Sequence, residues 1–247
     1  MNIIETLKSK DNPMTVEYLI ALFYQKYPNM EYLIDAGANK GFHFSRMNKL
    51  PKLDYCIGVE ANPDHIPGLQ SLIIENKSLI VAKALVGNNV TNSEITFKVN
   101  KDFHGRGGIK GHHIWDIIQP NLQFTELTVP TVQFDSLISD FFPERLDFCK
   151  MDLEGAELGI LLHSSKVYEM NCIIVMENSV HGPKLNEITR EEWLKFVESK
   201  NYFLVDFNFE PCVSDTLFHY NHVFLVPKAK YTIAREVFLN CYKLLEL

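Results

Sequence analysis

Apolar and polar positions along the chain separate an amphipathic N-terminal segment from a series of short buried runs. Residues 16–27 carry apolar side chains at helical spacing, namely Val16, Leu19, Ile20, Phe23 and Tyr27. Thr15 precedes them and can cap the helix. The pattern predicts an N-terminal helical extension within residues 1–30.

Short, continuous apolar runs predict buried strands, and helical stretches separate them. These runs lie at residues 31–35, 55–60, 79–86, 146–152 and 172–178. Strands that alternate with helices form parallel sheets in α/β proteins. Two later runs, at 202–207 and 216–226, have no helix between them and predict an antiparallel pair, and we expect a final helix from Thr232.

The stretches between these runs predict further elements. We expect a helix that ends near Pro51, and a helix from Asn62 to about Asn76 with Pro63 in its first position. Residues 93–99 alternate as a half-exposed strand, residues 127–138 predict a strand and a short helix, and Thr189 with Glu192 forms a capping box.

The residues around the first buried run carry the clearest functional signal. The run ends in Asp35 and is followed by turn residues that include Gly37 and Gly41, ahead of a predicted helix start. Glycines allow a ligand to approach the backbone, and the helix start offers unpaired N–H groups. The second run ends in Glu60, and a carboxylate there can accept hydrogen bonds from both hydroxyls of a ribose. The unit predicts a nucleotide-like cofactor, with an ordinary βαβ unit as the alternative.

The spacing of this loop also limits the kind of cofactor. Dinucleotide folds usually carry Gly-x-Gly-x-x-Gly, but Asn39 occupies the position of the second glycine. A ligand without a pyrophosphate therefore fits better. The segment 35–41 with the acidic end of the next strand resembles the first two motifs of class I S-adenosylmethionine-dependent methyltransferases.

We expect an α/β, Rossmann-like fold with a seven-stranded, mostly parallel sheet of order 3-2-1-4-5-7-6 and helices on both faces. The whole chain, 1–247, forms one methyltransferase domain in this interpretation. In such sheets ligands bind at the carboxyl ends of the strands. Strands one, two, four and five end there in Asp35, Glu60, Asp152 and Glu177, and converging acids repel unless a cation or hydrogen-bond donors lie among them.

Four segments together resemble the FkbM-like methyltransferases over roughly residues 30–180. They are AspAlaGlyAlaAsnLysGly (35–41), GluAlaAsnPro (60–63), GlnPheAspSerLeu (133–137) and LysMetAspLeuGluGlyAlaGlu (150–157). Gln133-Phe134 departs from the commoner Thr-Leu. The resemblance implies a class I fold that methylates hydroxyl groups of sugars and natural products with S-adenosylmethionine as cofactor. The cofactor-binding residues it indicates are Asp35, Gly37, Ala38, Asn39, Gly41, Glu60, Ala61, Asn62 and Asp152.

Methyl transfer to an alcohol needs help with the hydroxyl proton, because full ionisation of a group with a pKa of roughly 15 to 16 costs about 12 kcal/mol at pH 7. Asp152, Glu177 and Asn178 offer only oxygen ligands, which suit Mg²⁺ or Mn²⁺. They resemble the Asp…Asp-Asn triad of catechol-type O-methyltransferases. Glu154 and His181 are candidate bases, so the catalytic candidates are Asp152, Glu154 and His181.

Residues 101–113 are rich in glycine and basic side chains, which is typical of a mobile loop. The segment 101–125 is a candidate acceptor-side loop that could close over a bound acceptor, although a merely solvated excursion is the alternative. The histidines at 104, 112 and 113 are too irregularly spaced to predict a metal site.

Composition narrows the partners. A net charge of −7 gives no long-range attraction to phosphate backbones, and no Asn/Asp-Pro-Pro-aromatic motif follows the fourth strand. We therefore expect a small-molecule or glycan acceptor and no nucleic acid. No apolar run reaches the length of a membrane span, and the five cysteines, with Cys56, Cys149 and Cys172 inside apolar runs, are typical of reduced core residues. The expected compartment is cytoplasmic, and the oligomeric state is left open.

Two other classes of function remain compatible with the sequence. A non-catalytic S-adenosylmethionine-binding scaffold would keep residues 35–60 but would need no acids at 152–181. An NAD-dependent oxidoreductase would normally carry the glycine that Asn39 replaces.

Overall fold

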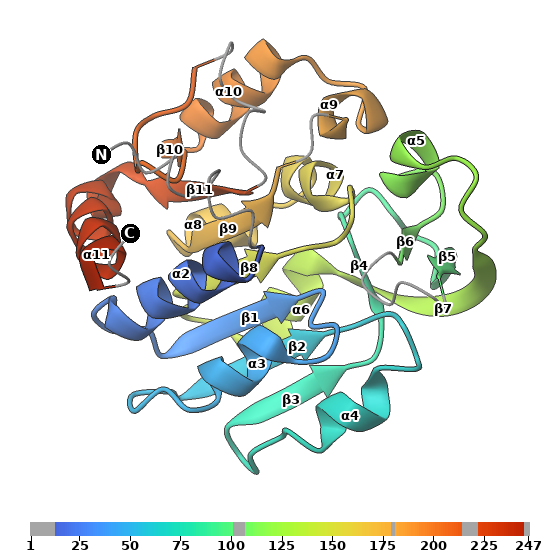
Figure 1. The fold of residues 1–247 in the computed structure, drawn as a ribbon, viewed down its shortest axis with the longest axis horizontal. Helices are drawn as coiled ribbons and strands as arrows, with labels where there is room; N and C mark the ends of the chain where they lie inside the picture. The colour runs from blue at the N-terminus through green and yellow to red at the C-terminus, as the bar shows by residue number, and fades with distance from the viewer. Residues whose placement is uncertain (1–12, 101–106, 179–180, 214–221, 245–247) are drawn as a thin grey trace.

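A seven-stranded sheet forms the centre of the molecule (Figure 1). The computed structural model describes residues 13–100, 107–178, 181–213 and 222–244. The strands are β1 (Tyr32–Ala36), β2 (Tyr55–Val59), β3 (Ser78–Val81), β8 (Phe148–Met151), β9 (Ile173–Glu177), β10 (Tyr202–Val205) and β11 (His222–Pro227). Their order, β3-β2-β1-β8-β9-β11-β10, is the predicted 3-2-1-4-5-7-6, with β11 antiparallel to both neighbours.

Helices cover both faces of this sheet. One layer consists of α2 (Pro13–Lys26), α3 (Phe42–Met47), α4 (Ile66–Gln70) and α11 (Tyr231–Leu244). The opposite layer consists of α6 (Phe134–Phe141), α7 (Glu157–Leu162), α8 (Lys166–Glu169) and α10 (Arg190–Ser199). In the described part of the chain no helix is both long enough and apolar enough to cross a membrane.

Alternation along each strand divides the core between the two layers. Leu33 and Phe148 pack with the α2 layer, whereas Ile34 and Cys149, one position further along each strand, pack with the α6 layer. Successive side chains of a strand point to opposite faces, so residues of one parity share a face. This parity determines which polar side chains meet at the carboxyl end of the sheet.

A second, smaller sheet was not predicted. It has the order β4-β7-β5-β6 and lies beyond the carboxyl ends of the central strands (Figure 1). Its strands are β4 (Ala84–Val86), β5 (Glu94–Val99), β6 (Gly108–Ile109) and β7 (Thr125–Gln133). The expected single strand at 79–86 is therefore wrong: the Lys83 N–H donates to the Val81 carbonyl at 3.0 Å, which turns the chain out of the central sheet into β4.

The segment 101–125, expected to be a loop, contains a strand and a helix among its described residues. Residues 101–106 lie outside the described part of the chain, but β6 pairs with β5 and is followed by α5 (Trp115–Ile118). His113 is buried and packs edge-to-face on Phe124. Pairing with β5 and burial of His113 attach residues 107–125 to the second sheet. Their role as an acceptor-side segment stays a prediction.

Several predicted boundaries shift. The first helix begins at Pro13, ahead of Thr15, and the helix expected from Asn62 is only α4, because Asn62 Oδ1 accepts the Asp64 N–H at 3.1 Å in a turn of its own. The helix expected to end near Pro51 is α3, which ends at Met47. The capping box at Thr189 is confirmed, and part of the last predicted strand, 216–221, lies outside the described residues. All five cysteines are free thiols.

Candidate active site

The loop after β1 has left-handed backbone at three positions. Gly37, Asn39 and Gly41 have φ angles of 77°, 49° and 82°. A Cβ at Gly37 would lie 1.9 Å from the Asp152 carbonyl oxygen, and one at Gly41 would lie 2.5 Å from Leu72 Cδ1. The space freed by these glycines is therefore filled by the protein itself, and Asn is one of the few side chains that tolerates the conformation at position 39.

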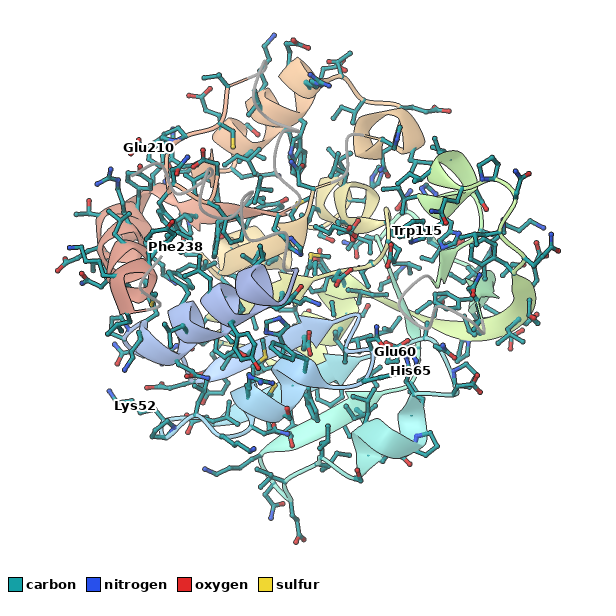
Figure 2. The ribbon with its side chains drawn as sticks, in the orientation of Figure 1. Lys52, Glu60, His65, Trp115, Glu210 and Phe238 are labelled. Atoms are coloured by element: carbon teal, nitrogen blue, oxygen red, sulfur yellow. The ribbon has the colours of Figure 1, made fainter. Side chains whose placement is uncertain are left out.

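Glu60 joins this loop to the end of β2. Its Oε2 accepts the Asn39 N–H and its Oε1 accepts the Asn62 N–H, both at 2.7 Å. Figure 2 shows Glu60 and His65 in the region between the central sheet and the second sheet. Each carboxylate oxygen has a second acceptor site, so Glu60 is oriented for a further pair of hydroxyl donors.

A cavity of about 620 Å³, counted with its open mouth, lies beside Glu60. We call it the Glu60 cavity. Val59, Leu85 and Phe97 form an apolar part of its wall. The predicted cofactor residues that line it are Gly37, Asn39, Glu60, Ala61, Asn62 and Asp152, and Glu154 lines it as well.

On the face of the sheet that α2 covers, the central strands end in a row of polar side chains. Asp35 on β1 is paired in register with Lys150 on β8. Glu177 on β9 is paired in the same way with His222 on β11. Parity places Asp35 and Lys150 on the face that Leu33 and Phe148 share, and Asp152 follows Lys150 by two residues. Strand register thus brings these charges together beneath α2.

Lys150 neutralises part of this row. Its Nζ lies 3.1 Å from Asp152 Oδ2 and 4.0 Å from Asp35 Oδ1. Although burial alone lowers the pKa of a lysine, the charges of Asp152 and Asp35 raise the pKa of Lys150 overall, so it is a cation at neutral pH. Asp35 is 1% exposed, and its Oδ2 accepts the Phe44 N–H at 2.9 Å. Burial raises the pKa of Asp35.

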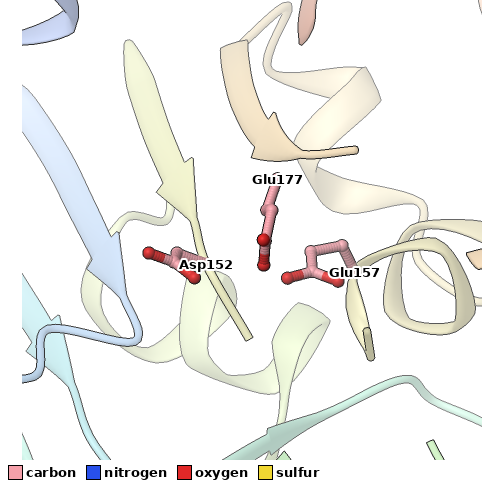
Figure 3. Close-up of side chains that lie close together, drawn as sticks. All are labelled: Asp152, Glu157 and Glu177. Atoms are coloured by element: carbon pink, nitrogen blue, oxygen red, sulfur yellow. The ribbon is translucent and has the colours of Figure 1, made fainter. Parts of the chain in front are cut away.

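Two acids of this row, Asp152 and Glu177, converge with a third carboxyl group, that of Glu157 (Figure 3). Asp152 follows β8, Glu177 ends β9 and Glu157 begins α7, and one oxygen of each lies within 4.8 Å of the others. Both oxygens of Glu157 are held by backbone N–H groups, of Leu153 and Gly155. Glu177 Oε2 is buried and has no hydrogen-bond partner within the described ranges.

Burial favours the protonated forms of Glu154, Glu157 and Glu177. Burial, followed by the nearby Asp152 charge, raises the pKa of Glu154 to about 9. Burial raises the pKa of Glu157 to about 7 and the pKa of Glu177 well above its usual range. A cation or a donor-rich ligand placed among them would reverse these shifts, because it would favour the ionised forms.

Glu154 connects the acids to the second sheet. Its backbone has a left-handed φ of 56°, and its Oε2 accepts a hydrogen bond from Trp115 Nε1 at 2.6 Å. Trp115, labelled in Figure 2, begins α5, so the segment that follows β6 contacts Glu154 directly.

The structure therefore assembles most of the predicted site. Asp35 and Ala38 line a second cavity, described below, while Gly41 lines neither cavity. Asn178 is buried directly after Glu177. His181 is half-buried just before α9 (Gly182–Leu185) and lines neither cavity.

Sequence reasoning missed Lys150, Glu157 and Glu17 as members of the site. Lys150 and Glu157 lie within the segment 150–157 that carried the resemblance, and that was a usable signal. Glu17 carried none, because only the packing of α2 across the sheet brings it to the strand ends.

Comparison with known families gives a match between residues 35–204 and the model of the methyltransferase FkbM domain. The chain belongs to this family, whose members are S-adenosylmethionine-dependent methyltransferases. The match begins within β1 and contains β2, β8 and β9, and it excludes α2 and β11. It therefore includes the four acids at the strand ends, Asp35, Glu60, Asp152 and Glu177. No curated protein matches the chain.

Solved structures with a similar arrangement are distant in sequence. An rRNA methylase from Streptococcus thermophilus is 9% identical over 87% of this chain and 96% of its own, with a TM-score of 0.43. Aeropyrum pernix fibrillarin, in complex with S-adenosyl-L-methionine, is 10% identical over 84% and 73%, with a TM-score of 0.41. Precorrin-6y C5,15-methyltransferase from Geobacter metallireducens is 11% identical over 84% and 83%, with a TM-score of 0.40. Likeness at this level says nothing about the acceptor.

Proposed function

We propose that the protein is an S-adenosylmethionine-dependent O-methyltransferase that acts on a hydroxyl group of a sugar, glycan or other natural product. The observation that carries this proposal is the position of Asp152. It lines the Glu60 cavity and also belongs to the cluster of Asp152, Glu157 and Glu177. A hydroxyl that reaches the cofactor's methyl group from the strand-end side would therefore meet carboxyl groups that can accept its proton.

The cofactor supplies the transferable methyl group when bound, and the chain's residues fix the geometry of the reaction. Glu60 orients the ribose, and the loop 37–41 faces the methionine end. Alignment of this kind can lower the activation barrier by an amount on the order of 7 to 11 kcal/mol. The apolar wall of Val59, Leu85 and Phe97 suits an adenine ring. Acids at the acceptor side disfavour a polyanionic acceptor, which supports a small molecule or glycan over a nucleic acid.

Glu154 is the better-placed candidate for the base. It lines the Glu60 cavity two residues beyond Asp152, whereas His181 lines neither cavity. A carboxyl group with a raised pKa is a stronger base once it is ionised. We propose that Glu154 takes the hydroxyl proton, with His181 as the alternative.

The acid cluster also fits a divalent cation. Asp152, Glu157 and Glu177 present hard oxygen ligands within reach of one ion, and Glu177 Oε2 has no other partner in the part of the chain that the structure describes. We propose Mg²⁺ or Mn²⁺ there, with the predicted Asn178 as a further ligand. Bound there, such an ion supplies a Lewis acid that lowers the pKa of the acceptor hydroxyl.

Transfer of a labelled methyl group from S-adenosylmethionine to a panel of deoxysugars and glycans tests the function. We expect turnover by the wild-type protein. The Asp152→Asn substitution should lower kcat by about 10² to 10⁴-fold and change cofactor affinity little. The control Asp140→Asn, at an exposed position on α6, should react at the wild-type rate. EDTA should abolish turnover and Mg²⁺ restore it. Binding of a nicotinamide cofactor in place of S-adenosylhomocysteine would contradict the proposal.

The remaining outcomes separate its parts. Turnover that survives chelation would reject the metal and leave the carboxyl groups as direct acceptors of the proton. Full activity of Asp152→Asn would reject the assignment of the strand-end acids. Cofactor binding without methyl transfer to any acceptor would favour the non-catalytic scaffold.

A further inference from the structure

A second cavity opens on the α2-facing side of the same loop. We call it the Glu17 cavity, after the side chain that α2 contributes to its wall. It shares Gly37, Asn39 and Asp152 with the Glu60 cavity, so the two cavities meet at these residues. A ligand with its ribose at Glu60 would extend across this junction into the Glu17 cavity.

The wall of the Glu17 cavity is rich in acceptors. Glu17, Asp35 and Asp152 supply carboxyl groups. The lysines in the wall are Lys150, which is buried, and Lys40, which is exposed. Asp35 Oδ1 and Asn39 Oδ1 are buried and have no hydrogen-bond partner among the described residues. Asp35 lines this cavity and is almost fully buried. Its Oδ1 lies 4.0 Å from Lys150 Nζ but accepts no hydrogen bond within the described residues, so it remains an acceptor for a donor in this space. A cationic group with several N–H donors would complement such a wall.

Glu17 is fixed in place by histidines from two other elements. Its Oε2 is hydrogen-bonded to His43 Nε2 on α3, and His43 Nδ1 lies 3.3 Å from the Tyr24 hydroxyl. Its Oε1 lies 3.8 Å from His222 Nε2 on β11. Burial opposes ionisation of Glu17, but the bond to His43 and the charge of Lys150 outweigh it and lower its pKa to about 2. Glu17 is therefore a pre-oriented anion at neutral pH.

We propose that Glu17 binds the α-ammonium group of the cofactor's amino-acid end, together with the free oxygens of Asp35 and Asn39. This inference rests on the proposed use of S-adenosylmethionine and extends the site beyond the family match, because Glu17 and His222 lie outside residues 35–204. It makes α2 a part of the cofactor site. The charges agree, since S-adenosylmethionine carries two cationic groups and one carboxylate.

Binding of three ligands can show whether Glu17 recognises the ammonium group or affects the whole cofactor site. S-adenosylhomocysteine contains the ammonium and carboxylate groups, S-adenosyl-3-thiopropylamine keeps only the ammonium group, and 5′-methylthioadenosine has neither. Calorimetry on the full chain would measure the affinity of each. The variants are Glu17→Gln and, as a matched control, Glu236→Gln, which changes an exposed acid on the neighbouring helix α11.

We expect Glu17→Gln to weaken binding of S-adenosylhomocysteine and S-adenosyl-3-thiopropylamine by about tenfold or more, because it removes a charge-assisted hydrogen bond. Binding of 5′-methylthioadenosine should not change, and Glu236→Gln should bind all three like the wild type. Equal weakening of all three ligands by Glu17→Gln would show a merely structural role and overturn the inference. So would unchanged binding of all three.

The same measurement distinguishes failure of the inference from failure of the proposed function. If the wild-type protein binds none of the three adenosine compounds, the proposed cofactor is wrong and the inference is rejected with it. If the wild type binds them and Glu17→Gln does not discriminate, only the inference is rejected. A thermal melt of each variant shows whether Glu17→Gln is folded, and Glu17→Asp, which keeps the charge, should recover part of the lost affinity.

Discussion

Glu60 combines a structural role with a position in the wall of a cavity. Its carboxylate accepts the backbone N–H groups of Asn39 and Asn62, so it fixes the loop after β1 and the turn after β2. It is also 7% exposed at the wall of the Glu60 cavity. A substitution there is expected to affect loop order as well as ligand affinity, because a lost acceptor leaves buried N–H groups unpaired.

We predict that Glu60→Gln weakens binding of S-adenosylhomocysteine by at least tenfold. The amide loses the negative charge and presents an N–H₂ group to a backbone donor, while a hydrogen bond to a charged group is worth about 1.5 to 3 kcal/mol. Calorimetry measures the affinity, and a thermal melt should show a lower midpoint. Glu75→Gln, an exposed acid after α4, is the control and should change neither. Unchanged affinity in Glu60→Gln would remove Glu60 from the cofactor site.

Among individual residues, the sequence predicted those that lie at the ends of strands. Asp152 and Glu177 follow or end apolar runs, and because parallel strands end at one edge their convergence could be expected before the structure was known. Glu17 could not be predicted, since its meeting with His43 and His222 depends on how α2 crosses the sheet. The role of Lys150 required the strand register that pairs it with Asp35.

Between elements, the closest approach at the site joins the ends of β1 and β8. Gly37 passes so near to the Asp152 carbonyl that no Cβ fits, and the Asp152 N–H donates to the Ala36 carbonyl at 3.0 Å. This contact sets the position of Asp152 relative to the loop 37–41. The position of Asp152 relative to this loop therefore depends on one glycine.

We predict that Gly37→Ala destabilises the fold more than Gly111→Ala does. Both glycines have a positive φ, of 77° and 92°, but a Cβ at Gly111 meets nothing within 4 Å. The left-handed strain is common to both variants, so the difference isolates the clash with Asp152, for which overpacking costs of about 1 to 3 kcal/mol are usual. Denaturant unfolding measures it. Equal losses in the two variants would show that the β1 and β8 ends can separate without cost.

Element types and the central sheet were predictable from the sequence where periodicity is strong, and the second sheet was not. The apolar residues of 79–86 form one continuous run, but a tight turn at Lys83 divides them between β3 in the central sheet and β4 in the second sheet. The two-residue strand β6 exists only through its pairing with β5. Such pairings are long-range contacts, and local patterns do not encode them.

For the molecule as a whole, acidic side chains are concentrated at one edge of the sheet. The net charge is −7, and Asp152, Glu154, Glu157 and Glu177 lie close together there with Lys150 as the neighbouring cation. Packing many ionisable groups at the end of a buried sheet lowers stability in the ligand-free protein, and proteins commonly accept such a cost at functional sites. The stability of the folded protein should therefore depend on pH and on bound cations, and both dependences should arise at this group of acids.

The sign of the pH dependence follows from the raised pKa values. The folded protein holds protons on Glu157 up to a pKa of about 7 and on Glu154 up to about 9, whereas unfolded glutamates lose them near 4.5. The stabilisation is complete below the unfolded pKa and is lost as pH rises through 7 to 9. His222 has a lowered pKa, because burial disfavours its cation, so its contribution changes only below pH 6.5 and leaves this window clear.

We therefore predict that the melting temperature of the metal-free protein falls between pH 6.5 and pH 9. Mg²⁺ should raise it more at pH 9 than at pH 6.5, because the cation binds the ionised carboxyl groups and must displace protons at the lower pH. Differential scanning calorimetry in EDTA and in Mg²⁺ measures both effects, and Glu154→Gln should flatten the metal-free profile. A melting temperature that rises with pH in EDTA would contradict the raised pKa values. A Mg²⁺ shift of the same size at both pH values would place the cation away from the Asp152, Glu157 and Glu177 cluster.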